Sequence, residues 1–298
     1  MNLRDLRYLV AVADTKHFGK AAELCHVSQP TLSAQIKKLE SYLGVELIER
    51  QPRRVALTDI GTRLVSHARR VLQETDELIS IARDNRDPLA GKLRVALIPT
   101  IGPYLLPLVA RKLHKQLPRL QLMLYEYRTE QLLEKLRNGE IELGILALPV
   151  DLDGLQAQEL YSEDFMAAVP RDHALAQKSS VKLGELAGES LLLLEDGHCL
   201  REQALEVCSR IDVRESQDYR ATSLETLRQM VAAGLGMTLL PKLAASGPFA
   251  HTAGLAIKPF TKPTPHRSVG AVWRKSTTRT AAIDAVCSVI RNELESHK

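Results

Sequence analysis

Apolar and polar residues alternate at helical spacing through the first 58 residues. Two short amphipathic helices are expected first, the second spanning the small residues of 18–25. A third is expected from Pro30 to Tyr42, because Ser28 is a good N-cap, Pro30 suits a first helical turn and Gly44 can end a helix. A β-hairpin is expected over 46–58. The positions of the third helix that the spacing assigns to the core are Leu32, Ile36 and Leu39.

One long helix is predicted from Thr58, as its N-cap, to about Asp87. Its apolar stripe repeats at alternating steps of four and three residues, which is typical of a two-stranded coiled coil. Because the stripe has no partner in its own short module, we expect this helix to join two copies of the chain. The Pro-Leu-Ala-Gly stretch at 88–91 is expected to be a linker. The stripe consists of Leu64, Ala68, Val71, Thr75, Leu78 and Ala82.

From Lys92 short apolar runs alternate with helical segments, which predicts parallel sheets flanked by helices. The run at 268–273 is expected to return to the first α/β unit, so that strands cross between two lobes and a cleft lies at the strand ends. Strands are expected at 93–98, 120–125, 143–147, 165–169, 190–194, 237–240 and 268–273. Helices are expected at 100–116, 129–138, from about 199, at 222–233 and at 278–295.

The fold class is therefore α/β with an N-terminal helical module. We expect a winged helix-turn-helix domain at 1–58, a linker and dimerisation helix at 59–87, and a two-lobed regulatory domain at 88–298. Lobe I would comprise about 92–162 and 268–298, and lobe II about 163–267. A length of 298 residues agrees with two or three domains.

The N-terminal module has the pattern of a DNA-binding domain. Its third helix presents hydroxyl, amide and lysine side chains on the face opposite its core, as a helix that enters the major groove does. The hairpin carries arginines at its tip, which could lie along phosphates as a wing. Residues 1–58 hold nine Lys or Arg against six Asp or Glu, a surplus of three in a chain of net charge +4. Helical spacing alone would also fit a solvated face; the basic wing favours DNA.

Two of the four cysteines, Cys199 and Cys208, lie nine residues apart and lack the paired CxxC spacing of a zinc site. In one helix they would be about 13 Å apart along the axis and on opposite faces. A disulfide needs Cα atoms within about 7 Å, so a Cys199–Cys208 bridge would require the segment to unwind. No metal is expected.

Cys199 is expected to be the reactive thiol. Asp196 or Cys199 itself could cap a helix there, and helix N–H groups with His198 and Arg201 would lower the thiol pKa. Cys208 would be the resolving thiol. Buried cysteines, however, usually act as small hydrophobes, and the residues alone leave both interpretations of this pair open. Cys25 and Cys287, which lie at core spacing, are expected to be of that kind.

The chain begins with Met1, charged residues follow within a few positions, and no apolar run approaches the ~20 residues of a membrane span. We therefore expect a cytoplasmic protein without membrane association. In that compartment thiols are kept reduced, and a disulfide is more often sensing or catalytic than structural.

The stretch from Phe18 to Arg50, with Leu-Thr-Asp-Ile-Gly at 57–61, resembles the DNA-binding signature of LysR-type transcriptional regulators. The two-lobed part resembles their effector domain, a periplasmic-binding-protein type II fold. The resemblance implies promoter DNA and RNA polymerase as partners and a homodimer or homotetramer as the assembly. It implies that the major-groove face is lined by Gln29, Pro30, Thr31, Ser33 and Lys37 and that the wing includes Arg50, Arg53 and Arg54.

Residues 193–201 (Leu-Leu-Glu-Asp-Gly-His-Cys-Leu-Arg), Cys208 and the stretch 220–228 resemble the peroxide-sensing branch of that family. The resemblance implies that the Cys199 thiolate attacks hydrogen peroxide to give a sulfenic acid, and that Cys208 condenses with it. The segment then refolds and antioxidant genes are activated, and a glutaredoxin- or thioredoxin-type reductant resets the disulfide. The residues implied to hold peroxide are Thr100 after the first strand, Thr129 capping a helix, His198 and Arg267.

No enzymatic activity and no cofactor are expected. The main alternative is a LysR-type regulator that responds to a small organic ligand in the inter-lobe cleft, which would not need Cys208. A thiol peroxidase would not carry a DNA-binding third, and a periplasmic solute-binding protein would need a signal peptide.

Overall fold

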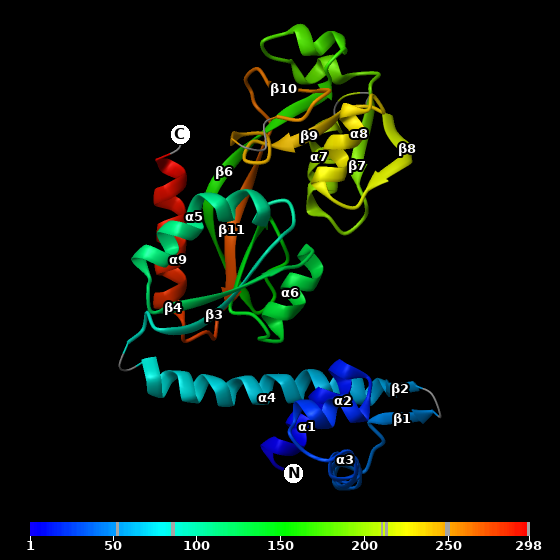
Figure 1. Cartoon of the computed structure of the whole chain (residues 1–298), viewed down its shortest axis with the longest axis vertical. Helices are drawn as coiled ribbons and strands as arrows, with labels where there is room; N and C mark the ends of the chain where they lie inside the picture. Colours follow the sequence, from blue (N-terminus) through cyan, green and yellow to red (C-terminus); the bar gives the residue numbers. More distant parts are fainter. Residues whose placement is uncertain (52–53, 85–86, 210, 212–213, 248–250, 297–298) are drawn as a thin grey trace. The chain divides into compact units, whose positions relative to one another are not determined.

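The computed structural model describes residues 1–51, 54–84, 87–209, 211, 214–247 and 251–296 (Figure 1). The chain divides into two compact units, Met1–Asp87 and Pro88–Lys298.

The N-terminal unit contains the predicted three helices, hairpin and long helix. They are α1 (Leu3–Thr15), α2 (Phe18–Leu24), α3 (Gln29–Leu43), β1 (Ile48–Gln51), β2 (Arg54–Leu57) and α4 (Asp59–Asp84). As predicted, α3 buries Leu32, Ile36 and Leu39, and it ends at Gly44 in the left-handed conformation (φ 72°). The Ser28 side chain caps it by accepting a hydrogen bond from Thr31 N at 3.3 Å.

Helix α4 begins as predicted at Thr58, whose Oγ1 accepts from Gly61 N at 2.9 Å and donates to Glu46 O at 2.8 Å. Its first turns pack on the core of this unit through Val65 and Ala68. Further along the predicted stripe, Val71 and Leu78 are 46% and 68% exposed in the single chain. The side chain of Ala82 lies outside the described residues.

The C-terminal unit is built on a seven-stranded sheet in the order β10-β6-β11-β5-β3-β4, with β9 paired to β6. Strand β3 is parallel to β4 and β5, whereas β6 is antiparallel to β11, β10 and β9. The sheet strands are β3 (Gly91–Leu97), β4 (Leu120–Glu126), β5 (Leu143–Leu148), β6 (Leu155–Pro170), β9 (Thr238–Pro241), β10 (Leu255–Pro259) and β11 (His266–Arg274). Within this sheet the predicted parallel pairing is thus correct for β3, β4 and β5, and the pairing of the other strands is antiparallel.

Helices and a second sheet complete this unit. Strands β7 (Ser190–Leu194) and β8 (Arg214–Ala221) form a parallel pair. The α-helices are α5 (Gly102–Gln116), α6 (Thr129–Arg137), α7 (Cys199–Cys208), α8 (Leu224–Ala232) and α9 (Thr280–Glu295), and the 3₁₀ helices are η1 (Ala174–Gln177) and η2 (Leu183–Leu186). Strands β8 and β10 were not predicted; β8 is a largely polar run, and polar residues are poor strand signals.

Two separate apolar cores define the two lobes. The lobe I core uses buried residues from 93–160 and 269–294, and the lobe II core uses residues from 165–260 together with Tyr104. The long strands β6 and β11 pair with each other and run between the lobes, as Figure 1 shows. Side chains near the middle of these strands therefore lie where the lobes meet.

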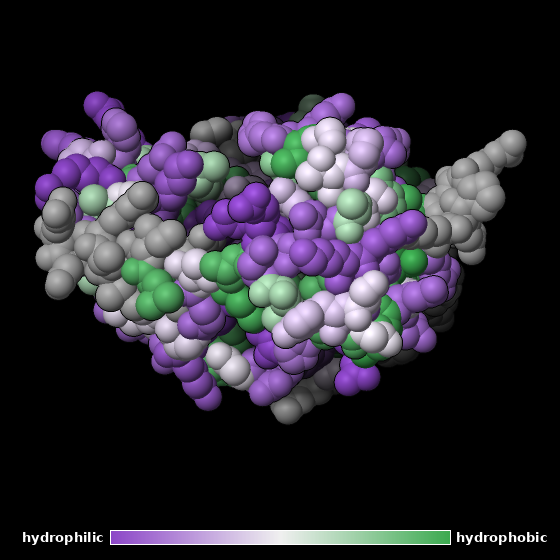
Figure 2. Space-filling model, turned by 90° about the horizontal axis from the view of Figure 1, so that it is seen from below, coloured by the Kyte–Doolittle hydropathy of each residue, from purple (hydrophilic) through white to green (hydrophobic). Residues whose placement is uncertain are grey.

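Among the described residues no helix combines the length and apolar character needed to cross a membrane. On the face drawn in Figure 2 hydrophilic residues predominate, and hydrophobic residues form small separate groups.

Candidate functional site

Cys199 and Cys208 are the first and last residues of α7, and both are free thiols. Nine helical steps separate them by about 13 Å along the axis, as predicted. Cys199 is half-buried and Cys208 is buried in the lobe II core. A disulfide between them therefore cannot form while α7 keeps this conformation.

The start of α7 differs from the prediction. The N-cap residue is His198, which makes no side-chain cap bond, so neither Asp196 nor Cys199 caps the helix. The Asp196 carboxylate instead binds Arg201 Nε at 3.0 Å and Arg220 Nη1 at 3.1 Å. Two arginine partners hold this carboxylate away from the first-turn N–H groups.

The pKa of the Cys199 thiol is raised, not lowered as predicted. Burial is the largest cause. The hydrogen bond that the Thr129 hydroxyl can donate to the thiolate, and the charge of Arg267, lower the pKa only in part. The predicted cation, Arg201, is turned away, because its guanidinium binds Glu215 Oε1 at 2.8 Å as well as Asp196. The site thus holds a protonated thiol at rest and can stabilise a thiolate from two sides.

His198 is buried, and its pKa is lowered first by that burial and then by the charge of Arg128. The ring is therefore neutral near pH 7 and does not stabilise a thiolate by charge, contrary to the prediction. The ring donates a hydrogen bond to the backbone of Thr222, while Nε2 is buried without a partner among the described residues. A neutral imidazole that donates through one nitrogen accepts through the other, so Nε2 is available as a proton acceptor.

Thr129 is the first residue of α6 and does not cap it; the N-cap position belongs to Arg128, so that prediction was wrong. In the resting structure Thr129 Oγ1 is buried with no hydrogen-bond partner in the described part of the chain. It nevertheless lies close enough to the Cys199 sulfur to stabilise a thiolate. Buried polar groups are nearly always paired, so an orphan hydroxyl beside a thiol marks a place for a polar ligand.

Arg267 connects the two lobes at this site. Its Nη1 donates to Thr100 Oγ1 at 3.2 Å and its Nη2 to Thr100 O at 3.0 Å. Its Nε and Nη2 bind Glu163 Oε2 at 2.8 and 2.7 Å, with side-chain exposures of 1% and 2% for the arginine and the glutamate. Glu163 Oε1 in turn accepts from Leu243 N at 2.8 Å.

Glu163 belongs to this site but was not predicted from the sequence. Arg267 and Glu163 are register partners on β11 and β6. The only local signal was a carboxylate just before the apolar run at 165–169, and such a residue is usually a solvated strand end. Its role depends on the pairing of distant strands.

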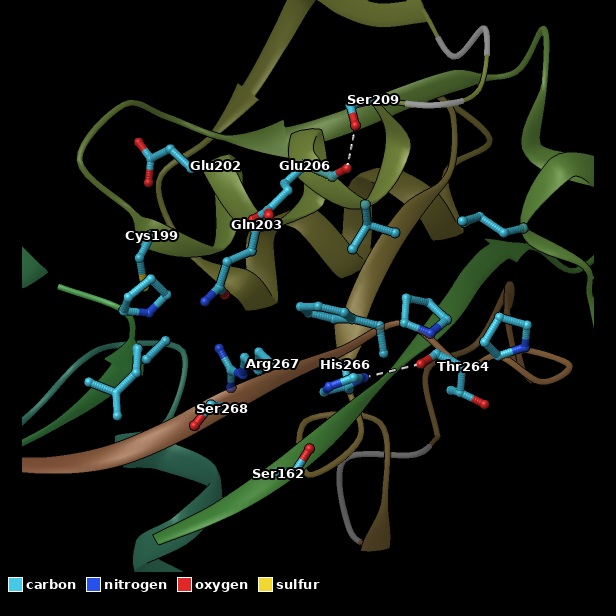
Figure 3. A pocket seen from close by; sticks show the side chains of 18 of the residues that line it. Ser162, Cys199, Glu202, Gln203, Glu206, Ser209, Thr264, His266, Arg267 and Ser268 are labelled. Carbon is cyan, nitrogen blue, oxygen red and sulfur yellow. Dashed lines mark hydrogen bonds between the residues drawn. The ribbon is translucent and has the colours of Figure 1, made fainter. Parts of the chain in front are cut away.

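Beside the thiol lies a cleft of about 840 Å³. Figure 3 shows Cys199, Glu202, Gln203 and Glu206 of α7 on one side. Arg267 and Ser268 of β11 lie across from them. The volume is within the range of small-molecule sites. The predicted inter-lobe cleft is therefore present, and Cys199 is one of the residues that line it.

The predicted DNA-contacting residues of α3 are displayed as expected. Gln29, Pro30, Thr31 and Lys37 are exposed, and Ser33 is half-buried. Arg50 and Arg54 lie in β1 and β2, but their side chains, and Arg53 altogether, lie outside the described residues.

Glu40 fixes the hairpin to α3. Its Oε1 accepts from Leu47 N at 2.9 Å and from Ile48 N at 3.2 Å. The wing therefore has a defined start relative to α3.

Cys25 and Cys287 behave as core residues. Cys287 is fully buried in lobe I, and burial raises its pKa to about 12. Cys25 packs half-buried against the N-terminal core, and burial raises its pKa too. The core interpretation of these two thiols is confirmed.

Comparison with known proteins agrees with this arrangement. Residues 3–62 match the bacterial regulatory helix-turn-helix protein family of lysR type, and residues 86–295 match the LysR substrate binding domain. The chain is 45% identical over 297 residues to the DNA-binding transcriptional dual regulator OxyR of Escherichia coli K12, covering 100% of this chain and 97% of that protein. It is 41% identical over 296 residues to the hydrogen peroxide-inducible genes activator of Haemophilus influenzae, covering 99% and 98%.

A solved structure supports the same assignment. Full-length OxyR C199D from Pseudomonas aeruginosa superposes with a TM-score of 0.80 at 40% identity, covering 98% of this chain and 95% of that one. Both domains and their order are matched over nearly the whole length. The chain belongs to the LysR family of bacterial transcriptional regulators.

Proposed function

We propose that this regulator senses hydrogen peroxide by oxidation of Cys199 and a reversible Cys199–Cys208 disulfide. The observation that carries the proposal is the buried Thr129 hydroxyl beside the Cys199 thiol, which has no resting hydrogen-bond partner among the described residues. His198, the neighbour of Cys199 in the chain, has a buried Nε2 that likewise lacks a partner in the described part of the structure. Peroxide is small and both donates and accepts hydrogen bonds, so it fits such a set of groups. The names of the relatives support the same signal.

The first chemical step forms the S–O bond. The neutral His198 ring takes the thiol proton, and the resulting thiolate attacks one peroxide oxygen. The O–O bond breaks, Cys199 becomes a sulfenic acid, and the departing hydroxide takes the proton back to leave as water. Thr129 and Arg267 stabilise the sulfur while it carries negative charge, as the direction of their effects on its pKa supports.

The second step forms the disulfide. Cys208 sulfur displaces the hydroxyl of the sulfenic acid, which leaves as water. Burial raises the pKa of Cys208 to about 11, so this thiol is protonated in the resting core and about 13 Å from its target. Condensation therefore requires α7 to unwind, which converts a two-electron oxidation into a conformational change.

The rest of the molecule would transmit that change to promoter DNA. We propose that α3 enters the major groove with the face lined by Gln29, Pro30, Thr31, Ser33 and Lys37, and that the wing carries Arg50, Arg53 and Arg54. The exposed Val71 and Leu78 of α4 would pack against a second copy in a homodimer, or in a homotetramer of two such dimers. In the same proposal the regulator acts in the cytoplasm with RNA polymerase as a partner. A glutaredoxin- or thioredoxin-type reductant resets the disulfide.

Peptide mapping tests the redox step directly. The reduced full-length protein is treated with about one equivalent of hydrogen peroxide, quenched with an alkylating agent under denaturing conditions and digested. We expect one disulfide, between Cys199 and Cys208, with Cys25 and Cys287 alkylated. DNA-affinity sequencing with the reduced and oxidised protein should give different binding profiles. If Cys199 and Cys208 both remain alkylated, the peroxide proposal is wrong.

The cleft supports a second candidate, regulation by a small organic ligand. A hollow of about 840 Å³ next to Cys199 is larger than peroxide requires. If peroxide leaves both thiols free and a small-molecule library raises the melting temperature, this alternative replaces the first.

A further inference from the structure

Arg128 reaches across from lobe I to the segment that carries Cys199. It occupies the N-cap position of α6, next to Thr129. Its Nη2 forms an ion pair with Glu195, and its Nη1 donates to Asp196 O at 3.4 Å. A Cβ added to Gly197 would meet Arg128 Cδ at 3.6 Å and Nη1 at 3.7 Å, so the arginine lies along this glycine. One side chain of lobe I thus touches all three residues of 195–197.

This three-residue segment is the covalent connection between strand β7 and His198-Cys199. On the lobe II side Glu195 N is held by Ala221 O at 2.9 Å. Asp196 is held by Arg201 and Arg220, which also belong to lobe II. On the lobe I side, Arg128 ties the segment to α6 through its ion pair with Glu195 and its hydrogen bond to Asp196 O.

We infer that Arg128 is a positioning residue, an inter-lobe latch that holds residues 195–197 and so keeps Cys199 in its pocket and opposes disulfide formation. The inference rests on the proposed function. Cys199 cannot approach Cys208 without movement at the start of α7, and that movement pulls on the latched segment. Because the latch contacts exist only while the segment is in place, they favour the reduced form over the oxidised one.

A second effect of Arg128 has the same origin. Its charge, after burial, lowers the pKa of His198. The arginine therefore also helps to keep the ring neutral, as a proton acceptor must be. Loss of Arg128 should make the disulfide more stable and should also change the pH profile of the initial oxidation.

The exposure of the Arg128–Glu195 ion pair sets the size of its effect on the dithiol–disulfide equilibrium. The Arg128 and Glu195 side chains are 41% and 32% exposed. Ion pairs this accessible change an equilibrium constant by about two- to fivefold and weaken with salt. The latch therefore tunes the redox equilibrium and does not dominate it.

The test compares Arg128→Met with wild type in full-length protein equilibrated in glutathione redox buffers, with the disulfide fraction read by alkylation and mass. We expect the dithiol–disulfide equilibrium constant of Arg128→Met to change about threefold in favour of the disulfide. The reduction potential of the Cys199–Cys208 pair then becomes about 14 mV more negative. Arg137→Met is the matched control. Arg137 is the last residue of α6, at the opposite end from Arg128, and its Nη2 pairs with Asp151 at 2.9 Å.

A double-mutant cycle with Glu195→Gln identifies the partner. If the latch acts through this ion pair, Arg128→Met changes the redox midpoint little further in the Glu195→Gln background. In 0.5 M salt the difference in redox midpoint between Arg128→Met and wild type should become smaller. Equal redox midpoints for wild type and Arg128→Met would overturn the latch, and so would fully additive effects of the two substitutions on the midpoint. Either result leaves the peroxide proposal standing. Absence of any Cys199–Cys208 disulfide in the wild type overturns both.

Discussion

Arg267 and Glu163 face each other on the two strands that run between the lobes, and their ion pair is almost completely buried. The same guanidinium holds both the hydroxyl and the carbonyl of Thr100. Its charge also lowers the pKa of Cys199. One buried pair therefore connects the strands that run between the lobes to the electrostatics of the Cys199 thiol.

Removal of one member of this pair should be strongly destabilising. Glu163→Ala leaves a buried guanidinium without its countercharge, and we expect a loss of about 3–5 kcal/mol in the free energy of unfolding of the regulatory domain. Urea unfolding followed by circular dichroism measures it. Asp151→Ala, which breaks the exposed pair with Arg137, should cost less than about 1 kcal/mol. Equal costs for the two variants would contradict the importance of burial here.

Thr129→Val should slow thiolate chemistry at Cys199. The change keeps the shape of the side chain but removes the hydroxyl that lowers the thiol pKa. A hydrogen bond to a charged group stabilises it by about 1.5 kcal/mol or more. Without this bond a smaller fraction of Cys199 is thiolate, and we expect its alkylation rate at pH 7 to be about tenfold lower. The pH profile of iodoacetamide labelling should shift to higher pH. Thr129→Ser should keep the wild-type alkylation rate, and Thr226→Val in α8 should not change it. An unchanged pH profile of labelling in Thr129→Val would contradict the prediction.

His198 should make stability fall in mild acid. Its pKa is lowered in the folded protein from 6.5, mainly by burial. The unfolded chain therefore takes up this proton first as the pH decreases, so stability is lost below about pH 6.5. Urea midpoints measured from pH 7.5 to 5 should decline less steeply for His198→Gln than for wild type. His114→Gln, at an exposed position of α5, should keep the wild-type slope of urea midpoint against pH. Identical slopes for all three proteins would refute the attribution of the acid destabilisation to His198.

Gly61→Ala should damage the DNA-binding unit alone. A Cβ at Gly61 would lie 2.1 Å from Leu47 O, where the backbone before the wing passes α4. We expect about 1–3 kcal/mol of destabilisation and loss of DNA binding in a gel-shift assay, because backbone must move to relieve the overlap. The Cys199–Cys208 redox midpoint should not change. Gly184→Ala, with open space around it, is the control. Wild-type DNA affinity in Gly61→Ala would show that the wing tolerates the shift.

The sequence by itself determined the features that depend on neighbours along the chain. The caps at Ser28 and Thr58, the end of α3 at Gly44 and the start of a helix near Cys199 follow from local spacing and backbone preference. Because helix geometry is fixed, the distance between the two cysteines followed as well.

Only the tertiary structure decided the electrostatics of the site. Glu163 and Arg267 are 104 residues apart and meet through strand pairing, which no local pattern encodes. The pKa of Cys199 was predicted in the wrong direction because sequence shows which charges are near along the chain, whereas burial and cross-lobe partners set the value. Arg201 is close in sequence but engaged elsewhere, while Thr129 and Arg267 are distant in sequence and act on the thiol. Solvation and through-space charge depend on packing in three dimensions, so they are fixed only when the lobes fold together.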